Sequence, residues 1–253
     1  IAAEAVPFTK TGGLGDVVGS LPKELKRQGV DVRIIMPKYG DIPARRLEEL
    51  TYITDIAVPV GWRSQYCGLF KMEYEGLTYY FIDNEYYFKR SGLYGYYDDA
   101  ERFAFFSRAV LEVLPYLDFK PDILHCHDWH AAAVPALLKA HYRHNGDYNN
   151  LKTVLTIHNI EYQGIFDQSV LTELLSLDPG EYSGDDAFGF NGAVNFLKGG
   201  LAFADHITTV SKTYAREIVT PEGGWRLDGF LRRRQRELIG ILNGIDYDVY
   251  YPA

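Results

Sequence analysis

Hydrophobic and polar positions along the chain repeat with two different periods. Short apolar runs of strand length alternate with segments in which apolar residues recur every three or four positions. This alternation is typical of βαβ units and a parallel sheet. The predicted strands are residues 1–8, 30–37, 122–126, 152–157, 206–210 and 238–242. The predicted helices are residues 16–28, 98–114, 129–144, 192–204, 211–220 and 226–237.

Three further apolar runs interrupt this alternation, at residues 52–60, 67–74 and 77–82. They predict an antiparallel meander with Gly76 at a turn, as an insertion in the main pattern or at its edge. No internal repeat and no Ser/Gly-rich linker divides the chain. The sequence therefore predicts one α/β domain over residues 1–253, with a mostly parallel sheet flanked by helices and a small antiparallel β insertion.

Composition and charge narrow the class of protein. No apolar run reaches the ~18 residues that span a bilayer, and no basic and then apolar leader opens the chain. The formal net charge of −8 disfavours nucleic acid or an anionic membrane as the main partner, because both reward a basic surface. Two cysteines are too few for a disulfide framework and indicate a reduced intracellular protein.

A glycine-rich loop joins the first predicted strand to the first predicted helix. Gly12, Gly13 and Gly15 let the backbone approach a ligand closely, and the helix that follows offers unpaired N–H groups at its positive end. This arrangement predicts an anion site, most plausibly for phosphate. The spacing fits neither a dinucleotide-binding loop nor a mononucleotide P-loop, since Lys10 precedes the glycines. Close packing at a strand–helix junction is the alternative interpretation.

Two more polar clusters follow predicted strands, where ligands bind in parallel α/β sheets. In residues 125–130, strand alternation sends His125 and His127 to one side, and Asp128 is predicted to cap the next helix. The other cluster spans residues 158–164 and begins with His158 and Asn159.

Other chemistries fit these residues less well. Three histidines and a cysteine in residues 125–130 are potential zinc ligands, but no C-x-x-C or H-E-x-x-H frame fixes a geometry, and core histidines are the simpler interpretation. A G-x-S-x-G hydrolase elbow is absent from the sequence. The arginines at 232–234 lie in a predicted helix of an acidic chain, which favours a solvated helix face over a nucleic-acid site.

The motifs together resemble the glycogen and starch synthases, which are retaining glucosyltransferases of the two-domain GT-B fold. Six segments match that family in its own order and cover the chain: residues 10–17 (KTGGLGDV), 127–130 (HDWH), 158–164 (HNIEYQG), 191–195 (NGAVN), 209–215 (TVSKTYA) and 240–246 (GILNGID). Gly223 and Arg226 depart from the Phe and Gly that are common there, which leaves the conformation of the loop at 221–229 open.

The resemblance implies that residues 1–253 form the Rossmann-like N-terminal, acceptor-side half of a GT-B fold, with the C-terminal nucleotide-binding domain outside this chain. The implied reaction moves glucose from ADP-glucose to the non-reducing end of an α-1,4-glucan with retention, without a metal or other cofactor. The expected partners are the sugar nucleotide, the glucan and the chain's own C-terminal domain, in a bacterial cytoplasm or a plastid stroma. The fragment alone is expected to be inactive. A GT-B transferase using UDP-glucose and a non-catalytic glucan-binding or scaffold module remain alternatives.

The resemblance also implies roles for individual residues. Lys10, Asp128 and His158 are expected to be catalytic: Lys10 faces the departing diphosphate, Asp128 the acceptor or the reacting sugar, and His158 the donor glucose. Further substrate-binding residues are Gly12, Gly13, Asp16, Trp129, Asn159, Gln163, Asn243 and Tyr87, and no metal ligand is expected. For Tyr87, core packing is an equally good interpretation.

Overall fold

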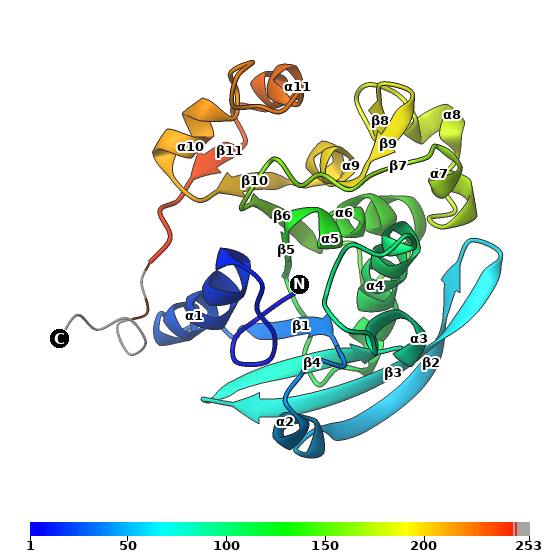
Figure 1. Ribbon diagram of the computed structural model, residues 1–253, viewed down its shortest axis with the longest axis vertical. Helices are drawn as coiled ribbons and strands as arrows, with labels where there is room; N and C mark the ends of the chain where they lie inside the picture. Colours follow the sequence, from blue (N-terminus) through cyan, green and yellow to red (C-terminus); the bar gives the residue numbers. More distant parts are fainter. Residues whose placement is uncertain (245, 247–253) are drawn as a thin grey trace.

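The computed structural model describes residues 1–244 and 246, and two four-stranded sheets lie side by side in it (Figure 1). The first sheet has the order β1-β4-β3-β2 and the second has the order β11-β10-β6-β5. The first contains β1 (Arg33–Pro37), β2 (Thr51–Val60), β3 (Arg63–Tyr74) and β4 (Leu77–Asp83). The second contains β5 (Ile123–His127), β6 (Lys152–Ile157), β10 (His206–Thr209) and β11 (Leu238–Gly240). A small third sheet contains β7 (Ile165–Phe166), β8 (Gly189–Phe190) and β9 (Ala193–Asn195).

The first residues of the chain connect the two large sheets. Ala2 donates its backbone N–H to the carbonyl of Ile35 in β1 (3.1 Å), and His127 in β5 donates to the carbonyl of Ile1 (3.0 Å). The N-terminus accordingly lies between β1 and β5 in Figure 1. The predicted strand at 1–8 is wrong: the first residues only bridge the two sheets, and the chain turns back at Ala5, which forms an isolated bridge with Thr9.

The strand pairing confirms a mostly parallel arrangement. β5, β6, β10 and β11 pair in parallel, and β1 pairs in parallel with β4. The predicted meander is confirmed as β2, β3 and β4, with Gly76 at a positive φ of 74° in the last turn. Since β4 pairs with β1, this meander extends the first sheet.

The helices differ from the predicted ones mainly at their ends. The longer ones are α1 (Gly13–Arg27), α4 (Asp99–Val113), α9 (Phe196–Phe203), α10 (Lys212–Glu217) and α11 (Asp228–Arg233). The predicted helix at 129–144 is divided into α5 (Asp128–Ala131), α6 (Ala133–Leu137) and a π-helical turn (Leu138–Tyr142). The predicted helix at 192–204 begins as strand β9. Short helices are α2 (Ala44–Glu48), α3 (Glu85–Phe88), α7 (Ser169–Glu173) and α8 (Pro179–Tyr182), and a 3-10 turn spans Leu114–Tyr116.

The core lies around α4, in which residues 102–111 are all buried. α4 contacts the first sheet and α6, and α6 contacts α9 (Figure 1). Gly200 of α9 permits this last contact, because a Cβ there would lie 2.4 Å from the carbonyl oxygen of Ala132. These helices form one side of the molecule, while α1 lies on the other.

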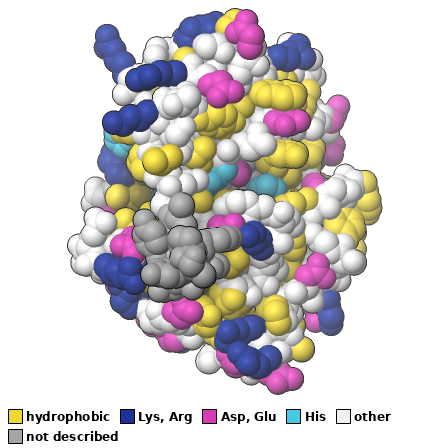
Figure 2. Space-filling view, turned by 60° about the vertical axis from the view of Figure 1, so that its left-hand side comes forward, with side chains coloured by type: hydrophobic (Ala, Val, Ile, Leu, Met, Phe, Trp, Pro, Cys, Tyr) yellow, Lys and Arg dark blue, Asp and Glu magenta, His cyan; other side chains and the backbone are white. Residues whose placement is uncertain are grey.

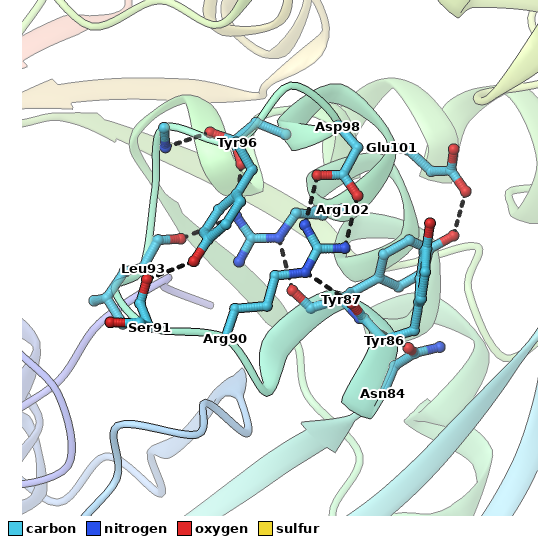
Figure 3. A network of polar contacts seen from close by, with 12 residues as sticks. Asn84, Tyr86, Tyr87, Arg90, Ser91, Leu93, Tyr96, Asp98, Glu101 and Arg102 are labelled. Carbon is cyan, nitrogen blue, oxygen red and sulfur yellow. Dashed lines mark hydrogen bonds and ion pairs between the residues drawn. The ribbon is translucent and has the colours of Figure 1, made fainter.

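A buried arginine of α4 organises the tyrosine-rich segment 84–98. Arg102 is fully buried, and its guanidinium donates to the carbonyls of Tyr87 (2.7 Å) and Leu93 (3.0 Å) and to the Asp99 carboxylate (2.5 Å) (Figure 3). Arg102 therefore holds the backbone of this segment through two of its carbonyls. This placement brings Tyr94 against the candidate site described below.

Candidate active site

The carboxylate of Glu4 contacts the glycine loop. Glu4 is buried, and its carboxylate accepts hydrogen bonds from the Thr11 amide (2.5 Å), the Thr11 hydroxyl (2.8 Å) and the Gly12 amide (3.4 Å). The amide of Gly12 is thus directed at Glu4. Glu4 was missed from the sequence, where it stands as a lone acidic residue in an apolar run.

Lys10 lies on the outer side of the loop. Its ammonium pairs with Asp16 of α1 (2.7 Å), and both side chains are about a third exposed or more. Gly12 is the N-cap residue of α1, and α1 begins at Gly13, three residues after Lys10. A cation and the positive end of a helix therefore lie together, as anion binding requires.

Asp128 joins the second cluster to the third. It stands at the end of β5 with a positive φ of 56°, and its Oδ1 accepts the amide N–H of His158 (2.8 Å). The prediction that Asp128 caps the following helix is wrong, because the strained backbone turns the carboxylate across to the neighbouring strand end. Burial raises the pKa of Asp128 to about 7, and the charge of Glu4 adds to this, against the amides of His158 and Asn159.

The histidines form short polar chains across the second sheet. His125 and His127 lie on one side of β5, as predicted, with ring centroids 4.2 Å apart. His125 Nε2 is 2.6 Å from the Thr156 hydroxyl, and His127 Nδ1 is 2.9 Å from His158 Nε2. Burial lowers the pKa of His125 to about 3 and that of His158 to about 4. At neutral pH these rings are uncharged hydrogen-bonding groups.

A cleft of about 390 Å³ opens over these rings. Its walls are α1, the histidines at 125, 127 and 158, and residues 241–244 and 246, which include Asn243. Lys23 of α1 forms an ion pair with Asp246 across it (3.3 Å). Figure 2 shows histidine side chains in a recess across the middle of the molecule. Asn243 therefore lies at the cleft, as expected, while Ile245 of the same motif is outside the described residues.

Comparison with known families decides the assignment. Residues 1–233 match the family model for the starch synthase catalytic domain. The chain belongs to this family. It is 57% identical over 251 residues to a glycogen synthase of Desulforamulus reducens and 56% identical over 251 residues to one of Caldicellulosiruptor saccharolyticus. Each alignment covers 99% of this chain and 52% of the relative, so the chain spans about half the length of the curated relatives that it matches.

A solved starch synthase structure shows the same fold. The catalytic domain of starch synthase IV from Arabidopsis thaliana, bound to ADP and acarbose, superposes with a TM-score of 0.92 at 39% identity. The alignment covers 100% of this chain and 52% of that chain. The sequence-based assignment to the glycogen and starch synthases, and to one half of a GT-B fold, is confirmed.

Several residues that the family resemblance marked as substrate-binding have structural contacts here. The side-chain amide of Gln163 donates to the carbonyls of Ile160 (2.9 Å) and Trp225 (3.0 Å), and accepts from Asn195 (2.6 Å). Gln163 thereby ties the loop at 158–164 to the loop at 221–229, whose family departures the sequence analysis noted. Asn159 is exposed, and its Oδ1 accepts the Glu161 amide (3.0 Å).

The aromatic candidates are largely buried. Trp129 is 8% exposed and packs against Phe103, with ring centroids 5.0 Å apart. Gly164 lies directly on the Trp129 ring, because a Cβ there would come within 2.4 Å of it. Tyr87 is fully buried and donates its hydroxyl to Glu101, which favours the core-packing interpretation over a place on a substrate path.

The family domain shows two further features in the part of the chain that the structure describes. Residues 1–244 and 246 contain no group of three or more His, Cys, Asp or Glu side chains arranged to hold a metal ion. Within the same residues, no helix is long and apolar enough to cross a membrane.

The buried histidines predict a loss of stability in weak acid. Burial lowers the pKa of His130 to about 3. The unfolded chain binds that proton near pH 6.5, so the stability is fully present above this pH and is lost below it, by roughly 1.4 kcal/mol per pH unit. In His130→Gln, the fall in the free energy of unfolding between pH 7 and pH 5 is expected to be about 2 kcal/mol smaller than in the unmodified protein.

Urea unfolding at the two pH values measures this difference. The raised pKa of Asp128 acts in the opposite direction, since its folded form binds a proton more readily, but it is common to both proteins and cancels. His206→Gln, at an exposed histidine, is the matched control. An equal pH dependence in all three proteins would contradict the burial of a neutral His130.

Proposed function

We propose that the complete protein transfers glucose from ADP-glucose to the non-reducing end of an α-1,4-glucan with retention, as a bacterial glycogen synthase. This chain supplies the acceptor-side half of the active site and a second domain supplies the other half. The observations that carry the proposal are the ion pair of Lys10 with Asp16 at the start of α1 and the hydrogen bond that joins Asp128 to His158. Relatives named glycogen synthase and a neighbour solved with ADP and acarbose support it.

Glucose transfer from a sugar nucleotide requires that the leaving diphosphate be stabilised. When the glycosyl–phosphate bond breaks, negative charge builds on the phosphate and positive charge on the sugar. The ammonium of Lys10 and the first amides of α1 match the developing negative charge. Because these groups supply the positive charge, the proposal includes no divalent metal, and transfer is expected to persist in EDTA.

Neutral histidines can form hydrogen bonds with the hydroxyl groups of a sugar. His158 shares one hydrogen bond with His127 through Nε2, which fixes its ring and leaves Nδ1 for a hydroxyl of the donor glucose. Asp128 holds the amide of His158 and so places that ring. Closure of the second domain over the cleft would exclude water and limit hydrolysis of the donor.

A transfer assay on the full-length protein tests the proposal. ADP-glucose and UDP-glucose labelled in the sugar are each offered with glycogen, fructose or glucose 6-phosphate as acceptor. The expected result is label in glycogen from ADP-glucose, in a form that an exo-acting α-1,4-glucanase releases. Transfer from UDP-glucose to a small acceptor would identify another GT-B transferase. Absence of any sugar-nucleotide turnover would favour the non-catalytic glucan-binding module.

The 253-residue chain alone is expected to lack this activity, because the donor contacts of the second domain are missing. Glucose incorporation by this fragment at a rate near that of the full-length protein would contradict the division of the site between two domains. A bacterial cytoplasmic location forms part of the proposal, since the glycogen synthases compared above are bacterial.

A further inference from the structure

Glu4 is a carboxylate buried to 3% exposure that accepts four hydrogen bonds. Oε2 receives the amides of Thr11 and Gly12, and Oε1 receives the hydroxyls of Thr11 (2.8 Å) and Tyr94 (3.0 Å). Removing a carboxylate from water costs several kcal/mol unless its oxygens are satisfied, and here each oxygen has two donors. These four hydrogen bonds therefore stabilise the buried negative charge of Glu4.

The carboxylate lies directly beneath the glycine loop. Gly15 of α1 packs against it, since a Cβ at Gly15 would touch Glu4 Oε2 (3.4 Å) and crowd the Cβ of Lys10 (3.2 Å). Tyr94 reaches the same carboxylate from the segment that Arg102 anchors, and its ring stacks on His130 with centroids 4.3 Å apart. Glu4 thus links the loop to the tyrosine-rich segment.

We propose that Glu4 is a positioning residue: an internal anion that fixes the backbone of residues 10–12, so that Lys10 and the first turn of α1 are held ready for a diphosphate. The inference rests on the proposed function. It has a specific consequence for the loop. The amides of Thr11 and Gly12 are engaged by Glu4, so the diphosphate is bound by the Lys10 ammonium and the first amides of α1 instead.

Replacing the carboxylate by a carboxamide removes this arrangement. A glutamine places an NH₂ group where one oxygen stood, so the two hydroxyls must turn to accept from it, and the two amides are left with a neutral oxygen in place of a carboxylate oxygen. In full-length Glu4→Gln, the Kd for ADP is expected to rise by about tenfold or more, as for the loss of charge-assisted hydrogen bonds. The kcat for glucose transfer is expected to fall, while the KM for glycogen stays within about twofold.

Backbone hydrogen exchange supplies a readout that needs neither ligand nor turnover. The amides of Thr11 and Gly12 are expected to exchange at least about tenfold faster in Glu4→Gln than in the unmodified protein, because a neutral amide oxygen accepts more weakly than a carboxylate oxygen. Glu4→Asp, which keeps the charge but shortens the reach, should lie between the two. Glu48→Gln, at an exposed position on α2, is the matched control and should change none of these values.

The outcomes separate the inference from the proposed function. If the unmodified protein transfers glucose but Glu4→Gln matches Glu48→Gln in exchange and ADP binding, the inference is overturned. Tighter ADP binding by Glu4→Gln would also overturn it, because charge repulsion would then outweigh positioning. If the unmodified protein transfers nothing, the proposed function fails, and amide exchange still decides the role of Glu4. Should Glu4→Gln fail to fold, Glu4→Asp supplies the same readouts, and unchanged exchange at Thr11 and Gly12 in that variant overturns the inference.

Discussion

Replacing Lys10 by alanine in the full-length protein is expected to lower glucose transfer by more than tenfold, a loss of ~2–4 kcal/mol in transition-state stabilisation. Lys10 contributes a cation at the start of α1, where negative charge on the departing diphosphate would develop. The effect should fall on kcat with ADP-glucose, since the interaction strengthens as the bond breaks. Steady-state kinetics with glycogen as acceptor measures it.

Lys89→Ala is the matched control. Lys89 is also an exposed lysine in an ion pair, with Glu85 in α3 (3.0 Å), but it lies outside the residues assigned to the site. Its rate should equal that of the unmodified protein. A Lys10→Ala enzyme as fast as Lys89→Ala would remove Lys10 from the mechanism, whatever its position beside the glycines.

Replacing Arg102 by methionine is expected to lower the free energy of unfolding by ~3–5 kcal/mol, as for other broken buried ion pairs. The substitution keeps a long apolar side chain but leaves the carbonyls of Tyr87 and Leu93 (Figure 3) and the Oδ1 of Asp99 without the guanidinium donor. Urea unfolding of both proteins gives the difference. Arg45→Met, at an exposed arginine of α2 paired with Glu49, should change the stability by less than ~1 kcal/mol. Equal losses of unfolding free energy in the two variants would show that the buried Arg102 stabilises the fold no more than an exposed arginine does.

Much of the fold followed from local pattern. Strand β6 was predicted with its observed bounds, and α4 within one residue at each end, because both are long, strongly apolar and bounded by a clear stop. The first eight residues were harder. Their composition is strand-like, but only Ile1 and Ala2 make strand-like hydrogen bonds to β1 and β5, and the turn at Ala5 depends on packing that local sequence does not show.

The sequence indicated which segments could form the site, but not which partners their side chains would contact. The three clusters were predicted from their places after the predicted strands, and His125, His127 and His158 of the second and third clusters line the cleft. The partner of each side chain depends on tertiary contacts, and here the prediction was weaker. Asp128 was assigned to its own helix, whereas its positive φ turns it to the His158 amide 30 positions away. Glu4 was missed because a lone acid in an apolar run carries no motif.

We propose that the glycine loop, Asp128 and His158 form one side of a single sugar-nucleotide site. A crystal structure of the full-length protein with ADP tests this arrangement. The diphosphate is expected within hydrogen-bond distance of Lys10 Nζ and the first amides of α1, with the Thr11 and Gly12 amides still on Glu4. The terminal phosphate is expected to face His158. A diphosphate bound away from Lys10 and α1 would contradict this arrangement.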